Sequence, residues 1–187
     1  MGAWLFAGGI SAQPEPSYLE AGAARRLRAW MIPAEAHRRA NPVPPSPEAI
    51  EAGLAHFADH CAICHANDGS GQIEIGQNLY PRSPDLRAEA TQSLSDGALF
   101  YIIEEGVRLT GMPGWKTGTP EGEHESWRLV HFVRHLPKLT DEERRRMERM
   151  NPRSAEAWRA EQEIERFLAG DDVEPRAAPD EGHGGHE

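Results

Sequence analysis

Apolar side chains recur every three or four residues over several stretches of this 187-residue chain, which is the spacing of helices that bury one face. No stretch alternates apolar and polar residues over a useful length, so we expect no strands. The pattern therefore predicts an all-α fold. Helices are expected over residues 18–31, from 46 to about 61, and over 95–106, 125–136, 140–148 and 154–168.

Residues that favour the first positions of a helix stand where three of these stretches begin. Ser46 precedes Pro47, Ser95 precedes Asp96, and Thr140 precedes three acidic residues. A serine or threonine hydroxyl can accept a hydrogen bond from the first free backbone N–H groups of a helix. The side chains expected to be buried are Ile50, Leu54, Phe57 and Cys61, then Leu99, Ile102 and Ile103, and finally Leu129, Phe132, Val133 and Leu136.

Net charge divides the chain into three parts. Residues 1–46 carry +2, residues 47–137 carry −7 and residues 138–187 carry −5, which gives −10 overall. The acidic balance argues against a nucleic-acid binder, because no basic face could hold a phosphate backbone. We expect a stiff proline-rich linker, then a domain at 47–137, a charged helical extension at 138–170 and a disordered acidic, histidine-containing tail at 171–187.

The first 46 residues begin with an apolar run, Ala3–Ala12, that is too short to cross a bilayer. It resembles the end of a signal peptide or of a membrane anchor, although the positive region that precedes such segments is missing. An apolar but disordered terminus is the alternative. Further on, residues 18–31 predict a short amphipathic helix with Leu27, Trp30 and Met31 on one side and arginines beside them.

The only two cysteines, Cys61 and Cys64, are followed directly by His65. Cys-x-x-Cys-His is the signature of covalent haem attachment, because each thiol can add across a vinyl group of the porphyrin while the adjacent imidazole reaches the iron. A structural zinc site would need four ligands, and a thioredoxin-like redox pair would need a βαβ context. A chance match within a helix is the remaining alternative. Haem c, with its iron, is the predicted cofactor.

Roughly residues 48–137 resemble a class I cytochrome c domain, which is a single-haem, all-helical electron carrier. In that family a methionine sulfur from a later loop takes the second axial position on the iron, and Met112 lies in a matching Gly-Met-Pro loop. The resemblance implies that His65 and Met112 are the iron ligands. It also implies a cytochrome c fold wrapped around one covalently bound haem, with the charged helices added after it.

A Pro-Asp-Leu segment resembles the Pro-Asn-Leu segment of the same family. The resemblance implies that the Pro84 carbonyl accepts the Nδ1 proton of His65, and that Leu86 touches the porphyrin. Trp115 would border the haem edge or a propionate, and Arg108 would pair with that carboxylate. These residues complete the predicted haem site.

Histidines outside the motif are not expected to form a site. His131 and His135 are four residues apart and fall opposite the apolar face of their helix, so we expect a solvated pair. His183 and His186 stand in the tail, where they would bind copper or zinc weakly. A metal-handling protein is therefore a weak alternative.

Together these features predict a one-electron carrier rather than an enzyme, because two axial protein ligands leave the iron no open position for a substrate. The resemblance implies a periplasmic or secreted protein, with the N-terminal run as a tether to the outer side of the cytoplasmic membrane. The expected partners are redox proteins, including a membrane-bound respiratory complex. One alternative is a cytochrome subunit of a larger oxidase or dehydrogenase. Another is a haem-based gas or redox sensor, or a peroxidase, in which Met112 is not bound.

Overall fold

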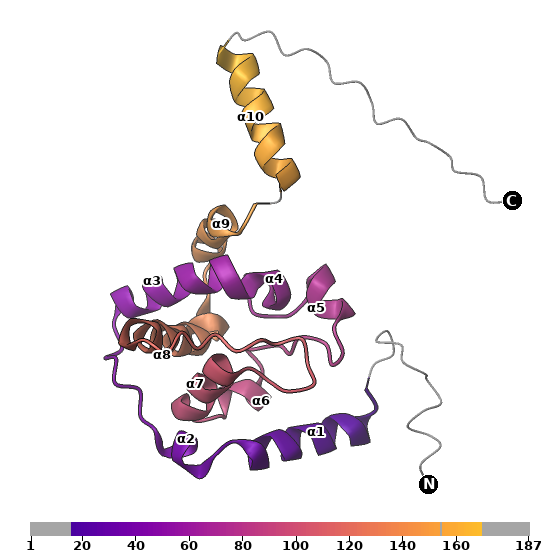
Figure 1. The fold of residues 1–187 in the computed structure, drawn as a ribbon, viewed down its shortest axis with the longest axis vertical. Coiled ribbons are helices and arrows are strands. Elements are labelled where there is room, and N and C mark those ends of the chain that lie inside the picture. The colour runs from indigo at the N-terminus through magenta and orange to yellow at the C-terminus, as the bar shows by residue number, and fades with distance from the viewer. Residues whose placement is uncertain (1–15, 154, 170–187) are drawn as a thin grey trace, which may run out of the picture. The chain divides into compact units, whose positions relative to one another are not determined.

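The computed structural model describes residues 16–153 and 155–169, and within these ranges it contains helices and no strand (Figure 1). The all-α prediction is confirmed. The chain divides into a unit that ends at Asn151 and a second unit that begins at Pro152. The apolar run Ala3–Ala12 and the predicted tail at 171–187 lie outside the described residues.

The first unit is built from short helices joined by loops (Figure 1). Among its described residues they are α1 (Tyr18–Met31), α2 (Ala34–Arg38), α3 (Pro47–His56), the π-helical turn η2 (Phe57–Cys61), α4 (Ala62–His65), α5 (Glu74–Asn78), α6 (Glu89–Gln92), α7 (Asp96–Glu105), α8 (Pro120–His135), the 3₁₀ turn η3 (Leu136–Lys138) and α9 (Asp141–Met150). The second unit contains α10 (Ala155–Ala169). No described helix has the length and apolar content needed to span a bilayer.

The three predicted helix starts are confirmed by their capping hydrogen bonds. The Ser46 hydroxyl accepts a bond from the backbone N–H of residue 49 at 3.1 Å, and the Ser95 hydroxyl accepts one from residue 98 at 3.2 Å. At α9 the cap is reciprocal, since Thr140 Oγ1 accepts from Glu143 N at 3.2 Å while a Glu143 carboxylate oxygen accepts from Thr140 N at 2.8 Å. Each cap satisfies backbone donors that the helix itself leaves free.

The predicted start of the 125–136 helix is wrong by about one turn. Helix α8 begins at Pro120, and its N-cap Thr119 accepts a hydrogen bond from the backbone N–H of Gly122 at 3.1 Å. The first turn carries glutamates and no apolar residue, so hydrophobic spacing alone gives no signal there. Acidic side chains nevertheless stabilise this end of a helix through its dipole.

Helices α3 and α8 cross at Gly53 and form the centre of the first unit. A Cβ atom at Gly53 would lie 2.8 Å from Phe132 Cβ and would overlap the backbone carbonyl of Arg128. The absence of a side chain therefore lets the two backbones approach closely. Beside the crossing, the rings of Phe57 and Phe132 pack with their centroids 5.1 Å apart, and both side chains are buried.

A second aromatic pair, which the sequence pattern did not single out, closes the core on the α7 side. Trp127 is 1% exposed and stacks on Phe100 with ring centroids 4.0 Å apart. Arg39 lies over the Phe100 ring at 4.5 Å and pairs with Glu123 at 2.9 Å. These contacts tie the segment before α3 to the body of the unit.

Candidate haem site

The cysteine motif stands at the end of a helix that changes its winding just before it. Helix α3 continues into the π-helical turn η2, in which the backbone N–H of Ala62 bonds to the carbonyl of Phe57. Cys61 ends this turn, and α4 carries Cys64 and His65. A π turn inserts an extra residue and rotates the helix that follows, so here it sets the direction of the motif.

Both cysteines are free thiols held at unusually high pKa values. Burial raises the pKa of Cys61 to about 12, and the nearby Cys64 adds to the shift. Burial also raises the pKa of Cys64. A thioredoxin-like pair needs a thiol with a lowered pKa, so these cysteines do not have the character of that alternative.

His65 is held so that its two ring nitrogens have different surroundings. Its Nδ1 atom is buried without a hydrogen bond of regular geometry, although the Pro84 carbonyl lies close enough to raise the pKa. Burial acts more strongly in the other direction, so the pKa of His65 is lowered and the neutral imidazole is favoured. Nε2 has no hydrogen-bond partner among residues 16–153. A neutral imidazole with Nε2 available is suited to bind a metal.

The loop after the motif folds back under it and brings the Pro-Asp-Leu segment to His65. The backbone N–H of Gly71 bonds to the His65 carbonyl at 2.8 Å, and that of Leu86 bonds to the Gly69 carbonyl at 2.8 Å. Gly71 has φ of +70°, and a Cβ atom there would meet the Ser83 backbone carbonyl carbon at 3.1 Å. The structure thus places residues 83–86 beside the motif and packs Leu86 against the core.

Met112 lies in a loop that returns to the end of α7. Its carbonyl accepts a hydrogen bond from Val107 N at 3.1 Å, and its own N–H donates to Thr110 Oγ1 at 3.1 Å. The loop ends where the backbone N–H of Trp115 bonds to the Ile103 carbonyl at 3.0 Å. The Met112 side chain is half-buried. These bonds hold the Gly-Met-Pro turn in a defined conformation.

Trp115 connects the methionine loop to the cysteine motif. Its ring lies 5.2 Å from the ring of His60, the residue before Cys61. Arg108, in contrast, is exposed and forms no ion pair within the described part of the chain. The structure therefore brings Trp115 to the motif, while it gives Arg108 no contact that supports the role expected for it.

Two free thiols, an available imidazole nitrogen and an ordered methionine loop make a donor set that fits a covalently attached haem. Residues 48–133, slightly under half of the chain, match the family model of cytochrome c oxidase, cbb3-type, subunit III. Residues 48–133 form a c-type cytochrome domain. Its cofactor is haem c with iron, and Cys61 and Cys64 are the only cysteines in the sequence that could attach it.

Residues that follow the matched range contact the segments on either side of the cysteine motif. Met147 of α9 is completely buried, and α9 contacts the turn η2. With its amide nitrogen as donor, Asn151 bonds to the Ala58 carbonyl at 3.1 Å and pairs reciprocally with the Asn67 amide at 2.9 Å. Ala58 precedes the motif and Asn67 follows it. We call Met147 and Asn151 the α9 brace. The two methionines of the charged run, Met147 and Met150, were the only signal for it in the sequence.

The predicted solvated pair on α8 of the cytochrome domain is wrong. His131 Nε2 lies 2.8 Å from the Val43 carbonyl, and His135 Nε2 lies 2.9 Å from a carboxylate oxygen of Glu143. Each histidine thus contacts a segment that packs against α8. The spacing of residues within α8 could not predict these contacts. Within the described ranges, no group of three or more His, Cys, Asp or Glu side chains could hold a metal ion.

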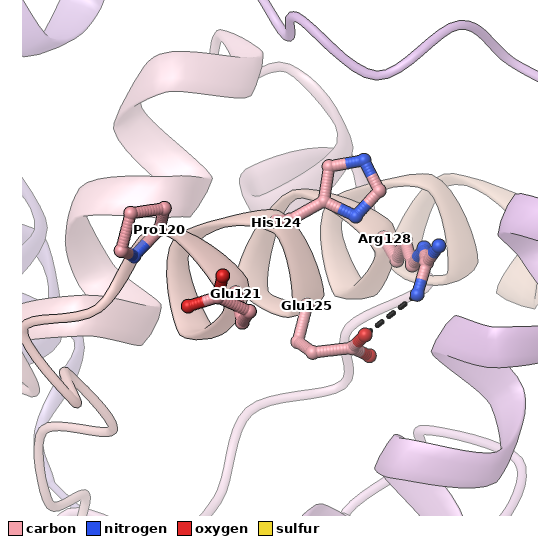
Figure 2. Close-up of a pocket in the computed structure, with 5 residues that line it drawn as sticks. All are labelled: Pro120, Glu121, His124, Glu125 and Arg128. Atoms are coloured by element: carbon pink, nitrogen blue, oxygen red, sulfur yellow. Dashed lines mark hydrogen bonds and ion pairs between the residues drawn. The ribbon is translucent and has the colours of Figure 1, made fainter.

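A hollow of about 390 Å³ lies along the first turns of α8 (Figure 2). It is lined by Pro120, Glu121, His124, Glu125 and Arg128. Glu125 and Arg128 form an ion pair of 2.6 Å across it, drawn as the dashed line in Figure 2. None of these residues belongs to the predicted haem site, so the hollow is a surface feature of the cytochrome domain.

Proposed function

We propose that this protein transfers one electron at a time through a single haem c, with His65 and Met112 as the axial ligands of the iron. The observation that carries the proposal is the Cys61–His65 motif with its half-buried imidazole, linked through Trp115 to the loop of Met112. The matched family supports haem-based electron transfer in general. The bound haem supplies an iron that alternates between the ferric and ferrous states.

The remaining site residues position the ligands and enclose the ring. Cys61 and Cys64 hold the porphyrin through thioether bonds, so binding does not depend on affinity alone. The Pro84 carbonyl, which lies near Nδ1 of His65, would accept its proton, which would leave Nε2 unprotonated for the iron and make the imidazole a stronger donor. Leu86 would exclude water from one side of the ring. Trp115 would cover its edge, and Arg108 would be available to a propionate.

With His65 and Met112 both bound, the iron would have no position open to a substrate, so the protein would act as a carrier rather than as an enzyme. Redox encounters of this kind are brief and involve small interfaces. The net charge of −7 over residues 47–137 favours a partner with a basic patch. Cytochrome c domains are typically extracytoplasmic, and we place this protein in the periplasm at the membrane surface.

The second candidate is a cytochrome subunit of a larger oxidase. It is favoured by the matched family, which is subunit III of cbb3-type cytochrome c oxidase. Purification from native membranes separates the two candidates. A carrier is recovered without stoichiometric partners, whereas a subunit is recovered together with membrane-bound oxidase polypeptides.

The ligand proposal is tested by spectra of the protein expressed with a haem-maturation system. Met112→Ala should abolish the weak far-red sulfur-to-iron band of the oxidised protein and let the reduced protein bind carbon monoxide. Met150→Ala is the matched control, because Met150 lies on α9 and is 38% exposed. A far-red band that survives Met112→Ala, or a wild-type protein that is high-spin when oxidised, would overturn the ligand assignment and favour the sensor alternative.

A further inference from the structure

Helix α1 turns its large apolar side chains away from the first unit. Leu19, Leu27 and Trp30 are 86%, 53% and 82% exposed. At 3.6 residues per turn they fall within an arc of about 80° on one side of the helix. Ala21 and Arg28, on the opposite side, are partly buried. A helix that only covered its own domain would have the reverse arrangement, with the large side chains inward.

Contacts near both ends of α1 join it to the rest of the first unit. Near its start, Glu20 accepts a hydrogen bond from the Tyr80 hydroxyl. Directly after its end Ile32 is buried, and α2 packs against α7 so closely that a Cβ at Gly97 would lie 2.9 Å from Arg39 Cβ. The outward face therefore belongs to a helix that contacts the rest of the first unit near both of its ends. It is an exposed apolar surface, and such surfaces mark interaction sites.

Charge indicates what covers this face. Residues 1–46 contain five arginines and three glutamates, and they are the only one of the three parts of the chain with a positive net charge. Exposed Arg26 falls about 20° from Leu19 around the helix, at the edge of the apolar face. The remainder of the chain, with −12, is repelled by an anionic surface. An anionic occupant is thus favoured at this segment over the rest of the chain, and Arg26 is the arginine that the face offers to it, since Arg39 is paired with Glu123.

We propose that the face of α1 formed by Leu19, Leu27 and Trp30, with Arg26 at its edge, lies in the headgroup layer of a bilayer that contains anionic lipid. Basic amphipathic helices bind in this way, with apolar side chains in the acyl boundary and arginines at the phosphates. Tryptophan favours this layer because its ring is apolar and its N–H is polar. The proposal is independent of how the haem is used.

The position of α1 in the first unit determines how the cysteine motif would be oriented relative to a bilayer. In Figure 1, α1 lies on one side of α6 and α7, and the motif-bearing helices α3 and α4 lie on the other. A protein seated on α1 would therefore turn its cysteine motif away from the lipid. The haem would be presented to partners in the aqueous phase.

The test is sedimentation of the full-length haem protein with vesicles of phosphatidylcholine alone or with added phosphatidylglycerol. Leu27→Ser/Trp30→Ser should weaken binding to the anionic vesicles at least about tenfold, because two large apolar side chains leave the interface. Arg26→Gln should weaken it about fivefold on anionic vesicles and leave binding to neutral vesicles unchanged. Ile164→Ser/Phe167→Ser on α10, where both side chains are also exposed, is the matched control and should bind as the wild type does.

Equal binding of the wild type and the α1 double variant would overturn the proposal, as would wild-type protein that does not sediment with anionic vesicles. If the α1 double variant bound vesicles as the wild type does but lost self-association or a co-purifying protein, the face would be assigned to a protein partner instead. The haem spectrum of each variant reports whether the cytochrome domain is intact. A failure of the His65 and Met112 assignment would appear in that spectrum and not in the sedimentation.

Discussion

Helices α1 and α8 are both amphipathic, but the chain uses their apolar sides in opposite ways. In α8, Val130 and Phe132 are completely buried where α3 crosses at Gly53. In α1, Trp30 is 82% exposed, and the partly buried residues on the opposite side are Ala21 and Arg28. The comparison shows that the same helical spacing can build a core or an exposed apolar surface. Which one results depends on whether another helix of the chain presents a complementary face.

The largest difference in stability between the two helices is expected when one large aromatic side chain on each is truncated. Phe132→Ala should lower the free energy of unfolding by about 4 kcal/mol, because it leaves a cavity at the α3–α8 crossing. Trp30→Ala should change it by less than about 0.5 kcal/mol, since the side chain contributes little to the folded unit in solution. Urea denaturation of the haem protein measures both. A loss above about 1.5 kcal/mol for Trp30→Ala would mean that α1 packs inward.

The next effect concerns α9, which combines a buried side with a highly charged one. Met147→Ala should lower the free energy of unfolding by about 3 kcal/mol, because Met147 is completely buried beside the turn η2. Met150→Ala, three residues further on, should change it by less than about 0.5 kcal/mol. Thermal unfolding followed by circular dichroism distinguishes them. Similar stabilities of the two variants would show that the α9 brace is not needed for the fold.

A smaller loss of stability is expected for a substitution at the crossing of α3 and α8. Gly53→Ala should lower the free energy of unfolding by about 2 kcal/mol, because the added methyl group collides with the Arg128 carbonyl and with Phe132. Gly22→Ala on α1 is the matched control, since nothing lies within 4 Å of the Cβ that it would add. In that exposed helix alanine should stabilise the protein by about 0.5–1 kcal/mol. Urea midpoints that move in the same direction for both variants would contradict this picture.

The smallest effect is pH-dependent and concerns the cap of α9. Burial tends to raise the pKa of Glu143, but hydrogen bonds from Thr140 and from His135 outweigh it, so the pKa lies below its ordinary value. A lowered pKa stabilises the folded state above the ordinary carboxyl pKa, and this stabilisation is lost as the pH falls through the lowered value. Glu143→Gln should therefore cost roughly 1 kcal/mol near neutral pH. The difference from wild type should vanish in acid, as measured by urea unfolding across pH.

The parts of this molecule that the sequence predicts are those specified by neighbouring residues. Ser46, Ser95 and Thr140 each act on backbone groups within three residues, so their helix starts are confirmed. The Cys-x-x-Cys-His motif is local in the same sense, and the cytochrome domain it indicated is supported by the family match.

The missed features depend on contacts between distant segments. Trp127 is buried because Phe100, from another helix, lies against it, and Asn151 bonds to residues that stand far before it in the chain. The π turn at η2 has no residue signature of its own, and it is stabilised by contacts with α9. The start of α8 could not be predicted from apolar spacing, because its first turn is polar. To predict any of these features, one would need to know which segment packs against it.

The α9 brace also has a consequence for the order in which the protein matures. Asn151 holds Ala58 and Asn67, which flank the cysteines but precede it by more than eighty residues. A chain that emerges N-terminus first presents Cys61 and Cys64 well before the residue that locks them in place has been made. The thiols are therefore open to the attachment machinery early in synthesis, and the segment closes over its cofactor only when the end of α9 arrives.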